Sequence, residues 1–135
     1  MKTFFFRNMT TRVLALALLF TCTQCFFELN VDRGPFLGTF DANENCPTWT
    51  DTYTMEITVD PSSDDGILLG NLYGIGASPI ATVTDEGTFV FSAQTFGDLT
   101  YSGSGSVSGN TLSVDFRVSD DSGGSIACTV LGTRR

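Results

Sequence analysis

The sequence predicts an all-β protein: an antiparallel meander of eight strands that closes into a small barrel, with a β-sandwich as the alternative. Apolar and polar side chains alternate through residues 111–118, which is typical of a strand with one buried face. Short turns such as Gly109-Asn110 join the apolar runs, so neighbouring strands are expected to be antiparallel. The chain after residue 34 contains no segment typical of a helical crossover.

Each strand is expected between clusters of turn-forming residues. The first lies within 34–46, a hairpin covers 99–118, and the remaining strands are expected at 52–59, 67–73, 80–84, 88–93 and 125–131. Closure is favoured over an open sheet because it removes the exposed edges of the first and last strands. Six phenylalanines are expected in the core: Phe36, Phe40, Phe89, Phe91, Phe96 and Phe116.

Cys46 and Cys128 are the only cysteines inside the expected domain, and we predict that they form a disulfide. Cys46 ends the first strand and Cys128 lies in the last, so their bond requires these two strands to be neighbours. The bond encloses about 82 residues, which corresponds to a stabilisation of roughly 4 kcal/mol in the chain-entropy model. Two buried free thiols are the alternative.

Residues 1–21 have the composition of an export signal. Lys2, Arg7 and Arg12 provide its positive charge, and Val13-Leu-Ala-Leu-Ala-Leu-Leu-Phe20 is an apolar run too short to span a bilayer. We therefore expect residues 22–34 to be a tether and residues 35–135 to be the folded domain.

The residues at the end of this segment predict the localisation. Leu19-Phe-Thr-Cys22 resembles a bacterial lipoprotein signal, in which the cysteine becomes the first mature residue and is acylated. The prediction is a lipid on Cys22, with Cys25 as the alternative, and a membrane contact through this anchor. The protein is then an outer-membrane lipoprotein of the cell envelope; a periplasmic or secreted protein without lipid is the alternative.

The composition excludes several chemistries. The chain has no histidine, which removes Ser-His-Asp and Cys-His catalysis, and its single lysine lies in the signal. Removing the three basic residues of the signal leaves four arginines against all fifteen acidic residues, a net charge of −11, so nucleic acid is not an expected partner. The protein is predicted not to be an enzyme and to need no cofactor or metal.

Three loops carry candidate functional residues. Asp64-Asp65 and Asp120-Asp121 are acidic pairs, but both lie in turns rich in Gly and Ser, where carboxylates are usually solvated. Weak calcium binding by Asp60–Gly66 is an alternative for the first of these loops. Trp49 lies in a Thr-rich loop and is a candidate contact for a ligand or partner; packing over the end of the core is the other interpretation.

Leu37-Gly-Thr-Phe40 is similar to the Gly-x-aromatic opening of calycin barrels, the group of lipocalins and fatty-acid-binding proteins. The resemblance implies that the aromatic ring closes the barrel base and that Arg134 or Arg135 covers it. The domain also resembles small uncharacterised Bacteroidota-type lipoproteins, which implies residence in the envelope. That resemblance implies no known activity. The predicted function is a non-enzymatic binding or accessory module with an envelope protein as partner; a calycin-type carrier of a small apolar ligand is the alternative.

Overall fold

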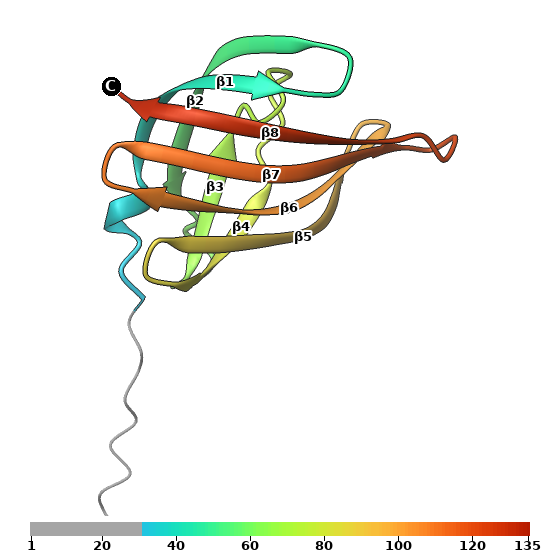
Figure 1. The fold of residues 1–135 in the computed structure, drawn as a ribbon. Helices are drawn as coiled ribbons and strands as arrows, with labels where there is room; N and C mark the ends of the chain where they lie inside the picture. Colours follow the sequence, from blue (N-terminus) through green and yellow to red (C-terminus); the bar gives the residue numbers. More distant parts are fainter. Residues whose placement is uncertain (1–30) are drawn as a thin grey trace, which may run out of the picture.

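A computed structural model describes residues 31–135, and these form a closed barrel of eight antiparallel strands arranged in sequence order (Figure 1). The short 3-10 helix η1 (Gly34–Phe36) leads into the barrel. The strands are β1 (Gly38–Asn45), β2 (Thr50–Val59), β3 (Gly66–Gly70), β4 (Ile80–Asp85), β5 (Thr88–Phe96), β6 (Leu99–Ser108), β7 (Thr111–Asp120) and β8 (Ser125–Arg134). The predicted all-β meander and its closure are confirmed, and the sandwich alternative is wrong.

The barrel closes where β1 pairs with β8. The register runs from Phe40 opposite Arg134 to Asn45 opposite Thr129, so the next opposed pair is Cys46 and Cys128. Their Cα atoms are 4.4 Å apart and their sulfurs are bonded, which confirms the predicted disulfide. This cross-link fixes the register of the first and last strands at one end of the barrel.

Large apolar side chains fill the interior. The alternation in β7 places Leu112, Val114, Phe116 and Val118 inside, as the pattern predicts. The fully buried interior also contains Phe40, Met55, Ile57, Ile67, Leu69, Leu72, Phe89, Tyr101 and Val130. Gly105 is needed here because a Cβ at this position would lie 2.3 Å from Cζ of the Phe89 ring.

One end of the barrel, here called the Phe36 end, is plugged by the Phe36 ring, which is fully buried and meets the Phe89 ring edge-on at 5.9 Å. The guanidinium carbon of Arg134 lies 4.6 Å from the centre of the Phe40 ring, and Arg134 donates hydrogen bonds to the carbonyls of Leu37 and Pro35. Of the two expected arginines, Arg134 is therefore the one that covers the aromatic ring.

Two details of the expected strands are corrected. The third strand ends at Gly70 and not at Tyr73, because Asn71 and Tyr73 adopt positive φ angles of 65° and 68°, which extended strands do not have. Residues 71–79 form a loop with a single bridge between Leu72 and Ala77. In β2, Met55 and Ile57 point inward as expected, but Val59 at the strand end is 42 % exposed.

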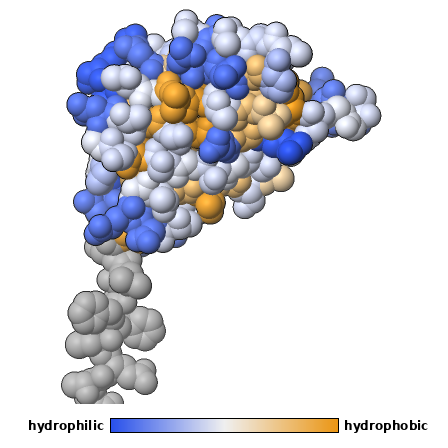
Figure 2. Space-filling model, viewed as in Figure 1, coloured by the Kyte–Doolittle hydropathy of each residue, from blue (hydrophilic) through white to orange (hydrophobic). Residues whose placement is uncertain are grey.

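The outer surface mixes polar and apolar areas. Figure 2 shows apolar patches on the viewed face that are interrupted by hydrophilic side chains, and Leu131 of β8 is the most exposed of the large apolar residues. No helix within residues 31–135 has the length and hydrophobicity needed to cross a membrane. The predicted signal, Cys22 and Cys25 lie outside the described residues.

Candidate functional site

The opposite end of the barrel, here called the disulfide end, contains a buried carboxylate. Glu44 follows Phe40 and Ala42 on the inward face of β1, and it is only 1 % exposed. The Glu44 Oε1 atom lies 3.5 Å from the Sγ atom of Cys46, directly beside the disulfide. A carboxylate is rarely fully buried unless a cation or several hydrogen bonds compensate it.

No basic side chain compensates Glu44 within residues 31–135. The arginines of this region have other partners: Arg33 and Arg134 bind carbonyls at the Phe36 end, Arg117 donates to Ser125, and Arg135 pairs with Asp41. Burial raises the pKa of Glu44, and the charge of Asp51 acts in the same direction. Hydrogen bonds from Tyr53 and from the Trp49 indole act against this increase, but the net pKa remains raised.

Tyr53 links the carboxylate to the loop above it. Its hydroxyl donates to Glu44 Oε2 at 2.6 Å and accepts a hydrogen bond from the backbone N–H of Tyr73 at 3.1 Å. Burial, and then the hydrogen bond to Glu44, raise the pKa of Tyr53 far above its usual range. The Tyr53 hydroxyl therefore stays protonated and can keep donating to the carboxylate.

Aromatic rings surround this pair. The Tyr73 ring meets the rings of Trp49, Tyr101 and Phe116 edge-on, with centroids 5.8, 6.0 and 6.1 Å away respectively. Tyr101 is fully buried, and its hydroxyl has no hydrogen-bond partner among the described residues. Burial first, and then the charges of Tyr73 and Glu44, raise the pKa of Tyr101 to about 12. Among the described residues the cluster thus contains a buried hydroxyl without a hydrogen-bond partner and a buried carboxylate without a cation.

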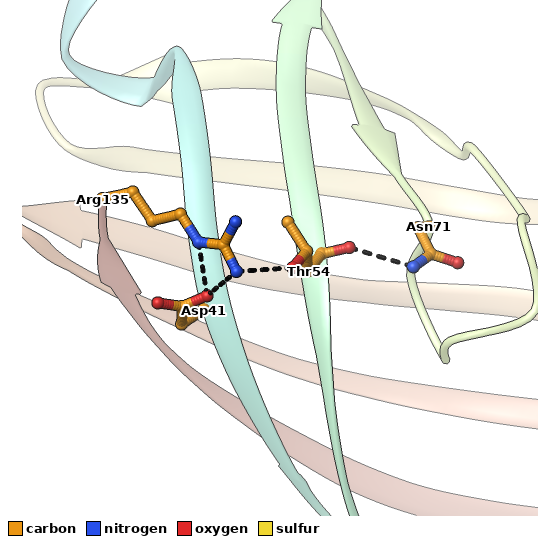
Figure 3. Close-up of polar contacts among 4 residues, drawn as sticks. All are labelled: Asp41, Thr54, Asn71 and Arg135. Carbon is orange, nitrogen blue, oxygen red and sulfur yellow. Dashed lines mark hydrogen bonds and ion pairs between the residues drawn. The ribbon is translucent and has the colours of Figure 1, made fainter.

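The loop 71–79 holds Tyr73 over this end. Asn71 fixes the start of the loop, because its Nδ2 atom donates to the carbonyl of Thr54 at 2.9 Å and its Oδ1 atom accepts from Gly76 N–H at 2.9 Å. Figure 3 shows the Asn71–Thr54 bond beside the ion pair of Arg135 with Asp41 on the outside of the barrel. The loop is therefore anchored to β2, and it carries Leu72 into the core and the partly buried Tyr73 over this end.

The structure brings together two of the sequence-based site predictions. Trp49 is 39 % exposed and packs on Tyr73 at the disulfide end, next to the bonded Cys46 and Cys128. It therefore fits both of its interpretations, as a surface aromatic and as a cover over the core. The sequence reasoning missed Glu44 and Tyr101, although Glu44 shares its strand parity with Phe40.

The acidic turns lie outside this cluster. In the β7–β8 turn, the Asp120 carboxylate accepts hydrogen bonds from Ser122 and Gly124. These hydrogen bonds stabilise the turn and lower the pKa of Asp120. In the loop 60–66, the guanidinium of Arg33 occupies the carbonyl cluster, with Nη1 at 3.3, 2.8 and 3.0 Å from the oxygens of Asp60, Ser63 and Gly66. An arginine of this chain thus holds the place considered for calcium.

Two other features of the described region offer weaker sites. The ligand atoms of Glu44, Cys46 and Cys128 lie within 4.8 Å of one another, but both sulfurs are in the disulfide and are not thiolates that bind metals. A shallow surface groove of 440 Å³ lies at the Phe36 end, lined by Val31, Asp32, Arg33, Gly34, Leu37 and Val59. It contains the Arg33 side chain that already binds the loop 60–66.

Comparison of the chain with protein families, with curated proteins and with solved structures finds no match. The fold and the site alone define the class: a small, disulfide-closed meander barrel with a packed interior and a carboxylate–tyrosine cluster at one end.

Proposed function

We propose that this chain is an exported, lipid-anchored envelope protein that acts as a non-enzymatic binding or accessory module. The observation that carries the proposal is the packed interior, in which the inward side chains of the barrel are buried against one another. Carriers of apolar ligands keep a cavity of several hundred Å³. A filled barrel therefore favours a module that works through its ends and its surface over the apolar-ligand carrier.

The disulfide supports the export part of the proposal. Protein disulfides persist in oxidising compartments such as the periplasm and the cell surface. The bond between Cys46 and Cys128 fits a chain that begins with the signal-like residues 1–21 and carries Cys22 directly after them. The resemblance to Bacteroidota-type lipoproteins points to the same compartment.

The geometry also supports a calycin-like barrel as the finer description of the fold. The arrangement of Arg134 over Phe40, beside the glycine at Gly38, is the one that the resemblance implies for the barrel base. The proposal of a non-enzymatic role rests on the absence of histidine, which removes Ser-His-Asp and Cys-His catalysis. Glu44 is the only buried carboxylate at the disulfide end among the described residues.

Intact mass spectrometry of the protein purified from its own envelope tests this function. We expect a mature chain that starts at Cys22, carries a diacylglyceryl group and has two fewer hydrogens than the reduced form. Cys22→Ser should release the protein from the membrane fraction, and Cys25→Ser serves as the matched control. A lipid-free chain that starts elsewhere contradicts the anchor, and loss of membrane retention in Cys25→Ser alone moves it to Cys25.

A further inference from the structure

We propose that the disulfide end of the barrel is a binding site for a small organic ammonium ion, with Glu44 as the anionic partner and the Tyr73 ring as the group that the ligand displaces. The inference rests on the binding-module part of the proposed function and is independent of the lipid anchor. It follows from four features of the same end of the barrel.

The first feature is the missing positive charge. Glu44 is 1 % exposed and receives a hydrogen bond from Tyr53, while its other oxygen faces the Cys46 sulfur. None of the arginines in residues 31–135 reaches it. Buried carboxylates are usually paired with a cation. A ligand that brings a positive charge and N–H donors would complete this site.

The second feature is the hydroxyl of Tyr101. It is buried completely and has no hydrogen-bond partner among the described residues, although buried hydroxyls are nearly always paired. The Tyr101 ring meets the Tyr73 ring, and the Tyr73 backbone N–H donates to the same Tyr53 hydroxyl that donates to Glu44. An ammonium group between the two side chains can donate one N–H to the carboxylate and another to this hydroxyl.

The third feature is the aromatic wall, which selects the kind of cation. The rings of Trp49, Tyr101 and Phe116 each meet the Tyr73 ring, so they surround the space that this ring would leave, and aromatic faces attract organic cations. Calcium requires six to eight oxygen ligands and magnesium an octahedral set, whereas the buried oxygen atoms described at this end are those of one carboxylate, Glu44, and of tyrosine hydroxyls. An anion would be repelled by Glu44. The acidic charge of the exported chain also attracts cations to the surface.

The fourth feature is the loop that fills the site. Tyr73 has a φ of 68°, a conformation that bulky residues rarely adopt, and Gly74 and Gly76 after it also have positive φ angles. Its backbone N–H donates to the same Tyr53 hydroxyl that binds Glu44. When the Tyr73 ring moves out, an aromatic-sized space opens next to the carboxylate, while the bond from Asn71 to Thr54 still holds the start of the loop.

Titration of the full exported protein with phenethylammonium tests the inference, with 2-phenylethanol as the neutral analogue and phenylacetate as the anionic analogue. Trp49 is the only tryptophan of the chain, so its fluorescence reports on this end, and calorimetry gives an independent measurement. We expect saturable one-to-one binding of the ammonium compound alone. Glu44→Gln should weaken binding at least about tenfold, because a charged hydrogen bond is lost. Asp115→Asn, which removes an exposed carboxylate on the outside of β7, should change the affinity less than about twofold.

Two further variants keep the test decisive if Glu44→Gln does not fold, as checked by near-ultraviolet circular dichroism and by the mass of the disulfide form. Tyr73→Ala should strengthen binding because the ligand no longer displaces a ring, and Tyr101→Phe should weaken it. The inference is overturned if the native protein and Tyr73→Ala both fail to bind, if the neutral or anionic analogue binds equally well, or if a folded Glu44→Gln variant binds normally. A lipid-anchored protein without ammonium binding overturns only this inference, and a lipid-free protein that binds overturns only the anchor.

Discussion

Replacement of both Cys46 and Cys128 by alanine should destabilise the barrel mainly through the unfolded chain. The two cysteines are separated by 82 residues. The chain-entropy model gives a loss of about 15 cal/mol/K for a closed loop of this length, which corresponds to about 4.5 kcal/mol at 25 °C. This is a large share of the roughly 5–15 kcal/mol by which small domains are usually stable. The melting temperature should fall by roughly 20 °C for a domain of this size.

Urea unfolding of the native protein and of the double alanine variant measures this difference. The slope of the free energy against urea should be steeper in the variant, because its unfolded chain is no longer cross-linked and exposes more surface. The reduced native chain separates the two contributions to the loss, since it lacks the bond but keeps both sulfur atoms in the core. A loss below about 1 kcal/mol with an unchanged slope would refute the reasoning. It would mean that β1 and β8 remain associated in the unfolded chain.

Three further changes have expected outcomes. The pKa of Glu44 is raised in the folded protein, so the free energy of unfolding should fall as the pH rises from about 4.5 through the folded pKa. Urea unfolding at several pH values measures this dependence, and Glu44→Gln should remove it. A variant with the same pH profile as the native protein contradicts the role of Glu44. Gly105→Ala should cost about 1–3 kcal/mol, since the new Cβ would overlap the Phe89 ring, and thermal unfolding that matches the native protein contradicts this packing. Arg134→Lys should lower the melting temperature clearly more than Arg135→Lys, because only the first replaces a guanidinium that stacks on a ring and binds two carbonyls; equal effects would contradict this role.

The fold was predictable because its determinants are local in the sequence. The alternation from Leu112 to Val118 requires a strand with one inward face, and short turns leave antiparallel pairing as the simplest connection. The pairing of Cys46 with Cys128 followed from their being the only cysteines in the domain. Because this bond requires the first and last strands to be neighbours, it also predicted that the barrel is closed. The end of the third strand was missed because the apolar run continues to Tyr73, although Asn71 and the glycines at 74 and 76 are residue types that tolerate the positive φ angles found there.

The candidate site was hidden for a different reason. Glu44 has the inward parity of Phe40, but an acidic residue at a strand end ordinarily points to water, so residue type and position gave opposite predictions. Its partners come from separate parts of the chain, Tyr53 in β2, Tyr73 in the loop after β3 and Tyr101 in β6. The β1–β2 hairpin places Tyr53 next to Glu44, and the closed barrel brings Tyr73 and Tyr101 to the same end. Trp49 was the one member whose type and loop position indicated a site in advance.

The described chain both enters and leaves the barrel at the Phe36 end. Gly34–Phe36 leads in there, and the backbone N–H of Arg135 donates to the carbonyl of Thr39 at 3.0 Å beside it (Figure 1). The two ends of the barrel therefore differ: the described chain enters and leaves at the Phe36 end, and Glu44 with the aromatic rings around it lies at the disulfide end. If Cys22 carries a lipid as proposed, the anchored segment joins the barrel at the Phe36 end, which is opposite the disulfide end. A tag or fusion partner attached at Arg135 would likewise leave the disulfide end free.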